Sequence, residues 1–565
     1  MVFSTINQSL SFHSSPESFI SSRLQDLALA DPDILPSASD KSKIVVASIL
    51  NRKVHIVPSY RLCKDSLDAS SSPSPTSLRP STIIPAITGP SSNEDAAKKP
   101  LDGSTLVAGP AYSQLMSDWF PRPNLLLEDG RIHASHKQAW LDQLATFPSD
   151  NTPRIRQIAE KHISSLFHPT VGGSDGKIDL YDNLKSFACE VLLAIFLDLS
   201  PSSSAEDFSD VESLQESLLR GQFSLFPVSI NARLWQSPRS RGLKARKELQ
   251  VKLRELTHRQ DASCPFLKQG RVSKDDASNH ALLFTSSLAV KALASLLTAF
   301  VLNLYLWRDT SPDDQVDDNN SGDKEKASTS KSTATTPSLA QLIRSQGDPD
   351  ARARMLRSIL LETERLSPPV VGVMRRVQRD ILLKPAGTTN GRILHGVHND
   401  DPSSSSSGGA ATAAHAVQAG HDIWLYLAGA SRDPAIFGDD ADLFRFDRYM
   451  SCTDTVKHHH AQATSSLSSE SRSPDSVPAG LAFGAGPKTC LGAPLVRHII
   501  LTIGEVMAES GLAIEGVVED RGVKGWLGWE AGVAAEWLAR GLKQLPVQRP
   551  RGPVRVEVRR VSVEG

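Results

Sequence analysis

The feature that most limits how this chain can fold is an isolated cysteine. Cys490 stands between glycine-rich turns and an apolar helical pattern, in the segment GLAFGAGPKTCLGAPLVRHIILTIGEVM that begins at Gly480. Iron–sulfur and zinc sites use clustered cysteines, commonly CxxC pairs, and Cys490 has no such neighbour. A cysteine nucleophile needs a histidine base held close in space, and nothing local supports that arrangement, although it stays open.

The glycines around Cys490 indicate a different role. Gly484, Gly486 and Gly492 allow the backbone to turn tightly and to approach a flat ligand closely. Amide N–H groups in such a turn can point at the sulfur and lower its basicity. A helix expected over 491–508 would stabilise negative charge at its start. We therefore interpret Cys490 as a thiolate ligand to haem iron.

Two further motifs accompany this segment. Glu362 and Arg365 lie three residues apart in LETERLSPPVVGVMRR, so they share one face of an expected helix. A solvated ion pair is the common explanation of that spacing, but a proline pair and an extended run follow here. Farther along, FRFDRYM contains Arg448. In this order the motifs, with Phe483-x-x-Gly486-x-x-x-Cys490-x-Gly492, resemble the cytochrome P450 superfamily.

The resemblance implies a fold, a cofactor and site residues. We expect a mainly α protein with small β-sheets, in the cytochrome P450 fold, that binds haem b. Glu362, Arg365 and Arg448 would form a buried structural network, whose members must all be satisfied. The haem-binding residues implied are Cys490 as axial ligand, with Phe483, Gly484, Gly486, Lys488, Gly492, His133, Lys137 and Arg376. For His133 and Lys137, an exposed amphipathic helix face is the alternative.

The resemblance also implies an activity. The expected reaction is mono-oxygenation, by hydroxylation or epoxidation, of a small secondary metabolite with O2. Electrons would come from NADPH through a reductase or ferredoxin partner. Two alternatives stay open at this point. One is the same fold acting as an isomerase, dehydratase or peroxygenase, and the other is a non-catalytic haem-binding or sensor protein.

The central apolar segment, 281–307, departs from the family pattern. Members that activate oxygen usually carry an acid and an alcohol in this helix, whereas LAVKALASLLTAF offers neither in that order. The threonine position falls on an apolar residue such as Leu293 or Leu296. Without the pair, water or substrate groups must supply protons for O–O cleavage. Lys291 interrupts the apolar run and is expected to face solvent. We expect a buried core helix here, with a membrane span as the alternative.

Length, charge and composition limit which kinds of protein and which cellular compartments fit this chain. The chain has 565 residues and a formal net charge of −1, which argues against nucleic-acid binding through a basic surface. Five cysteines favour a reducing compartment. Residues 1–40 are expected to be an extension without a clear membrane anchor, and 41–560 a single catalytic domain. We expect a cytoplasmic monomer, with peripheral association with the endoplasmic reticulum as the alternative.

Periodicity predicts the elements of the domain. A hairpin is expected over 43–58, short strands near 370–397 and at 554–558, and a strand-like start to HDIWLYLAGASRD. Helices are expected over 111–119, 131–146, 153–167, 178–197, 240–257, 279–307, 338–345, 350–366 and 490–510. Polar, low-complexity insertions are expected to form mobile surface loops at 309–337, 399–416 and 451–478. The third contains His458-His459-His460, three adjacent residues that cannot easily converge on one metal ion.

Overall fold

The structure is a computed structural model. It describes residues 2–29, 44–69, 83–85, 105–166, 177–224, 229–232, 235–259, 272–308, 336–383, 414–451, 477–516, 518 and 520–560. Most residues of the three expected insertions lie outside these ranges, as do His458, His459 and His460, so those predictions remain untested.

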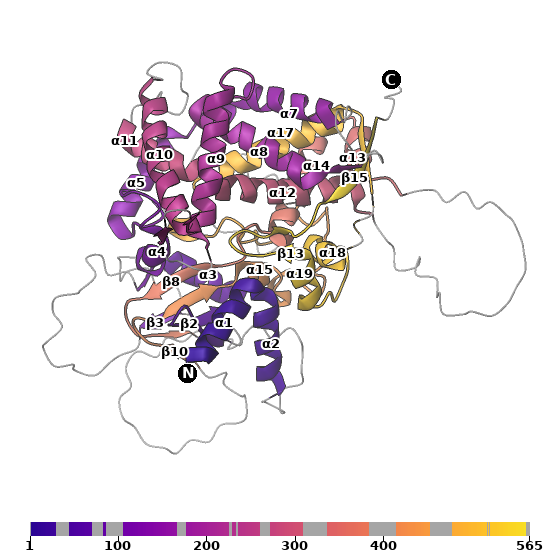
Figure 1. The fold of residues 1–565 in the computed structure, drawn as a ribbon. Helices are drawn as coiled ribbons and strands as arrows, with labels where there is room; N and C mark the ends of the chain where they lie inside the picture. Colours follow the sequence, from indigo (N-terminus) through magenta and orange to yellow (C-terminus); the bar gives the residue numbers. More distant parts are fainter. Residues whose placement is uncertain are drawn as a thin grey trace, which may run out of the picture.

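Helices form the larger part of the molecule, and most of the longer ones gather on one side of it (Figure 1). The longer helices are α1 (Val2–Ser14), α2 (Pro16–Leu29), α3 (Tyr60–Asp68), α4 (Gly109–Met116), α5 (Gly130–Gln143), α7 (Thr152–Leu166), α8 (Leu180–Leu197), α9 (Ala205–Gln222), α10 (Pro238–Arg259), α11 (Lys274–Phe284), α12 (Ser287–Leu306), α13 (Leu339–Ser345), α14 (Pro349–Leu366), α17 (Ala493–Glu509), α18 (Arg521–Leu527) and α19 (Ala535–Gly541). Single-turn helices are α6 (Phe147–Asp150), α15 (Leu427–Ala430) and α16 (Pro434–Phe437).

Helix α12 runs through the middle of the helical part (Figure 1). It packs against α8, α14 and α17, and its side chains from Leu293 to Tyr305 are all buried. Among the described residues, it is the one helix long and apolar enough to cross a membrane, and 78% of its apolar window is buried within the protein. The structure thus accounts for this apolar segment as a core helix.

The expectation of one continuous helix over 279–307 is wrong. The helix breaks at Thr285 and Ser286, and the Ser286 hydroxyl caps α12 by accepting a hydrogen bond from the Ala289 amide. On the other side of the break, Gln215 of α9 donates to the Leu282 carbonyl and to the Thr285 hydroxyl. These bonds satisfy backbone groups that the interruption leaves without helical partners.

The strands lie mainly on the other side of the molecule. The main sheet has the order β1 (Val45–Ile49), β2 (Arg52–Val57), β11 (Asp422–Leu425), β8 (Val373–Val377) and β4 (Leu106–Val107). Its first pair confirms the hairpin expected over 43–58. Three-stranded sheets have the orders β10 (His415–Val417), β9 (Ile381–Leu383), β3 (Ile83–Pro85), and β12 (Leu512–Glu515), β15 (Arg555–Arg560), β5 (Lys177–Asp179). Short pairs are β6 (Asn231–Ala232) with β7 (Trp235–Gln236), and β13 (Leu542–Lys543) with β14 (Arg549–Pro550).

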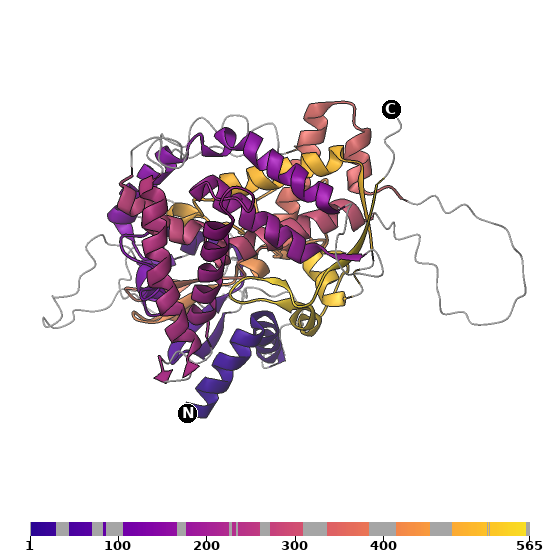
Figure 2. The same cartoon turned by 45° about the horizontal axis from the view of Figure 1, so that its top comes forward.

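The two N-terminal helices pack on the main sheet. Phe12 of α1 and Phe19 and Ile20 of α2 are buried in one cluster with Trp424 of β11. The indigo helices also lie beside the yellow C-terminal segment (Figure 2), where the Glu17 amide donates to the Gln544 side chain. Residues 2–29, which the sequence placed in an extension, therefore contribute to the core.

Candidate functional site

Cys490 occupies the turn before α17, as the sequence indicates. The turn contains a short 3-10 helix, η7 (Gly486–Lys488), and the Cys490 amide donates to the Phe483 carbonyl oxygen at 2.9 Å. This bond closes the segment 483–490 into a ring, which holds the sulfur at the amino end of α17.

Two glycines shape this loop through backbone angles that other residues rarely adopt. Gly484 has a φ of +72° and Gly486 a φ of +64°. Gly486 also lies against α3, since a Cβ atom there would be 2.6 Å from the Leu67 carbonyl oxygen. Gly492 has an ordinary φ of −80°, and its missing Cβ would lie 3.8 Å from the Cys490 sulfur. Contact with protein thus explains Gly486, while Gly492 leaves space beside the sulfur.

The exposure of Cys490 and the titration of its thiol point in different directions. The residue is exposed by its surface area, yet burial is the main cause that raises the pKa of its thiol. Hydrogen bonding from the Gly492 and Ala493 amides and the charges of Lys137 and Arg497 oppose that shift. The net pKa stays raised in the protein alone, but amide donors and cations beside a sulfur are the groups that stabilise a thiolate bound to a metal ion.

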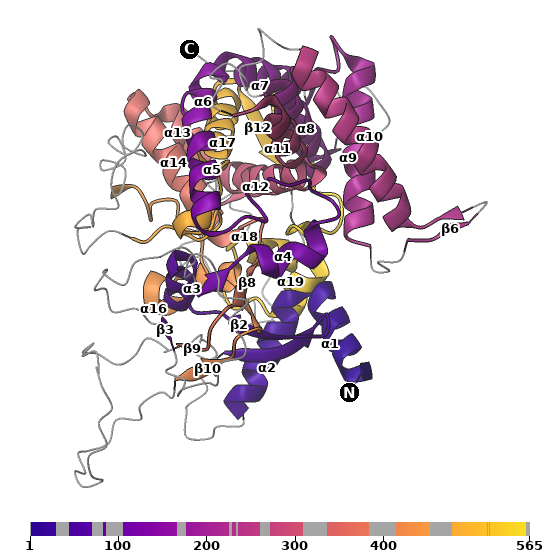
Figure 3. The same ribbon diagram turned by 90° about the vertical axis from the view of Figure 1, so that its left-hand side faces the viewer.

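Cationic side chains gather next to the Cys490 loop. Lys137 of α5 donates to the Pro487 and Thr489 carbonyl oxygens at 2.6 and 2.7 Å, so it ties α5 to the loop. Lys488 donates to the Leu125 carbonyl oxygen and pairs with Asp129 at 3.4 Å. Burial lowers the pKa of Lys488 to about 8, because Asp129 only partly compensates for the lost hydration. In the side view of Figure 3, α5 faces the viewer and α3 lies below it.

His133 is placed in this cationic group, four residues before Lys137 on α5. Its side chain is buried, and burial together with Lys488 and Lys137 lowers its pKa to about 3. His133 is therefore neutral at physiological pH. Among the haem-binding residues expected from the sequence, four have basic side chains, and the structure brings three of them together, namely His133, Lys137 and Lys488.

The fourth, Arg376, is paired with Asp422, while the neighbouring Arg375 acts on the cationic group. Arg376 donates two hydrogen bonds to the buried Asp422 carboxylate across the β8–β11 pair. Arg375 points to the opposite face of β8, because side chains alternate along a strand. It is 4% exposed, and its charge acts on His133, Lys488 and Asp129. Arg375 could not be singled out from the sequence. Which of two adjacent arginines faces the interior depends on how β8 is placed in the sheet.

Glu362, Arg365 and Arg448 meet in the interior, as the sequence suggests. Arg365 donates to Glu362 from Nε at 2.8 Å and from Nη2 at 2.7 Å, and both side chains are fully buried. Arg448 Nε donates to the same carboxylate at 3.0 Å and its Nη1 pairs with Asp440. Gly480 packs directly on this group, because a Cβ there would lie 2.7 Å from the Arg365 Cα. The network thereby supports the start of the Cys490 loop.

A second ion pair joins the same helix to the loop, and the sequence analysis missed it. Glu364 of α14 is buried and accepts two hydrogen bonds from Arg497 of α17. The Arg497 guanidinium also lies 5.1 Å from the centre of the Phe483 ring. The sequence signal for this pair is only that a second glutamate, Glu364, lies between Glu362 and Arg365. Its partner Arg497 is more than a hundred residues away in the chain, so the pairing could not be predicted.

The polar groups of α12 are committed to other parts of the protein. Lys291, expected to face solvent, instead pairs with Glu216 of α9 at 2.7 Å, and its side chain is 14% exposed. Ser287 donates to the same carboxylate at 2.6 Å. Ser295 donates to the Gln548 carbonyl oxygen, and Thr298 to a carbonyl of its own helix. The helix therefore presents neither a free hydroxyl at these positions nor a carboxylate of its own.

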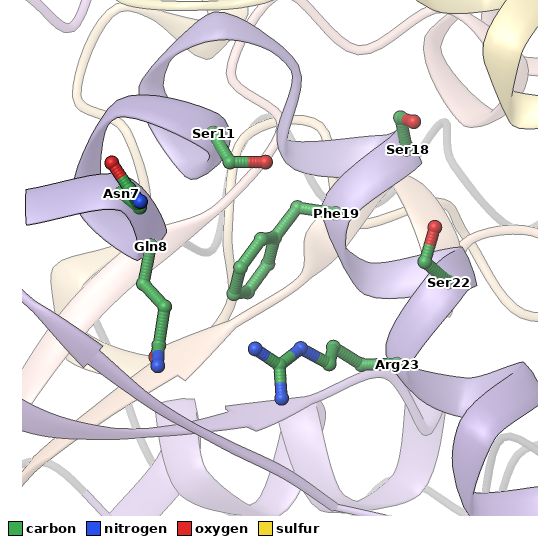
Figure 4. A pocket seen from close by; sticks show the side chains of 7 residues that line it. All are labelled: Asn7, Gln8, Ser11, Ser18, Phe19, Ser22 and Arg23. Atoms are coloured by element: carbon green, nitrogen blue, oxygen red, sulfur yellow. The ribbon is translucent and has the colours of Figure 1, made fainter. Parts of the chain in front are cut away.

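One surface pocket lies apart from this site, between α1 and α2 (Figure 4). Its volume is about 280 Å³, and it is lined by Asn7, Gln8, Ser11, Ser18, Phe19, Ser22 and Arg23. It contains no histidine, cysteine or carboxylate, so we do not assign a reaction to it.

Comparisons with known proteins bear on the fold. No protein-family model and no curated protein sequence matches this chain. The structure is similar to that of retinoic acid-bound cyanobacterial CYP120A1, with a TM-score of 0.53 and 14% identity over 92% of each chain. P450BioI, in complex with an acyl carrier protein ligated to hexadec-9Z-enoic acid, gives a TM-score of 0.47 at 14% identity, over 87% of this chain and 94% of that one. HmtT, involved in himastatin biosynthesis, gives 0.48 at 14% identity, over 86% and 91%. The first of these similarities, together with the mainly helical architecture, shows that this chain has the cytochrome P450 fold.

Proposed function

We propose that the chain is a haem-thiolate enzyme that binds haem b through Cys490 and oxygenates a small metabolite. The observation that carries this proposal is the setting of Cys490, an exposed residue whose thiol is acted on by the Gly492 and Ala493 amides and by the charges of Lys137 and Arg497. Electrons would come from NADPH through a reductase or ferredoxin partner. We expect a cytoplasmic monomer that acts on a small molecule.

The cationic group beside Cys490 fits the two carboxylates of haem b. Lys137, Lys488 and Arg375 bring three positive charges, while Asp129 and Glu128 are the carboxylates that act on Lys488. A cationic excess in a partly buried region is stabilised by an anionic ligand. We assign the propionate contacts to Lys137, Lys488, neutral His133 and Arg375, since Arg376 is engaged by Asp422.

When bound, haem supplies oxygen activation, and the chain's own residues set the conditions for it. The amides of Gly492 and Ala493 temper the basicity of the sulfur, and Arg497 stabilises its negative charge. The network of Glu362, Arg365 and Arg448 supports Gly480, where the Cys490 loop begins.

The test is the absorption spectrum of the dithionite-reduced protein with carbon monoxide, for wild type and Cys490→Ser. We expect a red-shifted, thiolate-type Soret band in the wild type and its loss in the variant. Cys189→Ser, at a buried cysteine of α8, is the control and should keep the band. A wild-type protein that takes up no haem, or a variant spectrum equal to the wild type, contradicts the proposal.

A specific observation favours a second candidate function on the same scaffold. The hydroxyls of Ser287, Ser295 and Thr298 are all hydrogen-bonded to other protein groups, so α12 has no ready proton donor there. Rearrangement or dehydration of an oxygenated substrate, or a peroxide-driven oxidation, needs no proton relay from α12. Turnover of such substrates in the absence of any reductase would favour this candidate. A strict requirement for a reductase would favour mono-oxygenation, and an iron spectrum that no small molecule perturbs would favour a non-catalytic haem protein.

A further inference from the structure

Three histidines join two β-sheets far from Cys490 in the sequence. His55 of β2 is 3% exposed and lies between the other two. Its Nδ1 is 2.9 Å from His415 Nε2 on β10, and its Nε2 is 3.2 Å from His421 Nδ1, just before β11. Each distance is that of a nitrogen–nitrogen hydrogen bond. The proposed function makes no use of this row of imidazoles.

The arrangement does not suit a metal ion. His415 and His421 approach different nitrogens of the central ring, so one nitrogen from each residue cannot converge on a common point. The described residues contain no group of three histidines, cysteines or carboxylates placed to hold a metal. Shared protons, rather than a cation, hold the row together.

The number of protons that the row can carry follows from its geometry. Each of the two hydrogen bonds needs one protonated and one bare nitrogen. With all three rings neutral this condition is met, and it is still met after one added proton, because protonated His55 can donate on both sides. After a second added proton, only one ring nitrogen is bare, so at least one bond has hydrogens on both nitrogens. The second proton therefore breaks a bond and places two positive charges within the row.

The surroundings do not compensate for added charge. Burial, followed by His415, His421 and Lys53, lowers the pKa of His55 to about 4. Burial and Lys53 also lower the pKa of His415. On the neighbouring strands, the residues opposite these histidines are apolar, namely Val46, Ile423 and Leu383.

The charged groups nearby have other partners or the same sign as the row. Asp422 follows His421 but is bonded to Arg52 and Arg376. Asp380 accepts from the Ala419 amide. Arg375 lies opposite Ile423, which in turn lies opposite His55, and carries a positive charge. Lowered histidine pKa values mean that the unfolded state binds more protons, so stability falls as the pH drops below the ordinary histidine value.

We propose that His415, His55 and His421 form an acid-sensitive latch that holds the β9–β10 ribbon on the main sheet and releases it on double protonation. The row retains both bonds with one proton and loses one bond with two. Because β10 pairs only with β9 among the described strands, the His55–His415 bond is its side-chain link to β2. Loss of the His55–His415 bond releases β10, and the helical part stays intact because it makes no use of this bond.

Hydrogen–deuterium exchange on the full chain tests the latch, with rates corrected for the intrinsic effect of pH. Between about pH 7 and pH 4, we expect peptides covering 415–421 to lose protection at least tenfold while α12 stays protected. The loss should follow the uptake of two protons. His415→Gln keeps an acceptor for His55 but cannot take up charge, so the link between β10 and β2 should survive protonation and the protection of residues 415–417 should no longer depend on pH. His258→Gln, at an exposed histidine of α10, is the matched control and should leave it unchanged.

Three results would overturn the latch. A loss of protection that is the same in His415→Gln as in wild type would show that the row does not control β10. If α12 lost its protection over the same pH range, the whole protein would be unfolding and the latch would not be a local device. If a chelator such as EDTA abolished the protection of residues 415–421 at neutral pH, the three histidines would be metal ligands instead. None of these exchange measurements depends on how much haem the protein contains, so the result is independent of the proposed function.

Discussion

The Glu364 carboxylate of α14 binds the Arg497 guanidinium of α17 through two hydrogen bonds of 2.8 and 2.6 Å. This bidentate pair connects the helix of the Glu362–Arg365 network to the helix that starts at Cys490. Burial alone would lower the pKa of Arg497. The charge and hydrogen bonds of Glu364 together have the larger effect, so the pKa of Arg497 is raised. The cation next to the sulfur is therefore held permanently charged and in a fixed place.

The first prediction concerns the Cys490 thiol in haem-free protein. Arg497→Gln removes a positive charge that lowers the pKa of Cys490, so alkylation by iodoacetamide near neutral pH should slow by about two- to tenfold. Mass spectrometry of the Cys490 peptide gives the rate. Arg497→Lys keeps the charge and should restore most of it, and equal slowing in both variants would point to a packing effect instead.

The second prediction concerns the buried network. Glu362→Gln leaves Arg365 and Arg448 without their shared carboxylate, so it should lower the free energy of unfolding by about 3–5 kcal/mol. Urea denaturation measures this loss. As the control, Asp182→Asn breaks an exposed pair with Lys185 and should cost less than about 1 kcal/mol. Similar small costs for both variants would mean that the network is not a stabilising unit.

The third prediction separates two adjacent arginines. Arg375→Gln should speed the transfer of haem to excess apomyoglobin by about tenfold, because it removes the propionate partner that we propose. Arg376→Gln should leave that rate within about twofold and instead lower stability, since it weakens the hold on the buried Asp422. The reverse pattern would return the propionate role to Arg376.

The fourth prediction concerns the N-terminal helices. Phe12 is buried, with its ring 4.9 Å from that of Trp424, so Phe12→Ala should cost about 3 kcal/mol of unfolding free energy. Leu10, on the same helix, is 52% exposed, and Leu10→Ala should change stability by no more than about 0.5 kcal/mol. If both substitutions were neutral in chemical denaturation, α1 would not be docked on the sheet in solution.

The fifth prediction concerns pH and the pair between α9 and α12. Burial alone would raise the pKa of Glu216, but hydrogen bonds from Lys291 and Ser287 lower it to about 2. The folded carboxylate releases its proton more readily than the unfolded one, so its contribution to stability is present above about pH 4.5 and is lost toward pH 2. Glu216→Gln should therefore be less stable than wild type at neutral pH, and the difference should shrink on acidification. A pH-independent difference in thermal unfolding would contradict this assignment.

The fold class, the turn that carries Cys490 and the Glu362–Arg365 pair were predictable from the sequence because their signals are local. The turn before α17 needs glycines at 484 and 486, which adopt positive φ, and the helical spacing of Glu362 and Arg365 puts both on one face. Hairpin 43–58 and most of the expected helices follow from periodicity over a few residues. Helices with weaker or polar patterns escaped prediction, among them α1, α2, α3, α9, α18 and α19.

The tertiary structure decided which distant groups meet. It placed Arg375 rather than Arg376 toward His133, because the register of β8 selects the inward face. It interrupted the helix expected over 279–307 by offering a cap and the Gln215 side chain as substitute partners. It turned Lys291 to Glu216 and aligned three histidines from separate segments of the chain. Local sequence thus determined the elements and the cysteine loop, through backbone preference and hydrophobic period. The charged and titratable contacts arose only when packing brought together residues that are far apart in the chain.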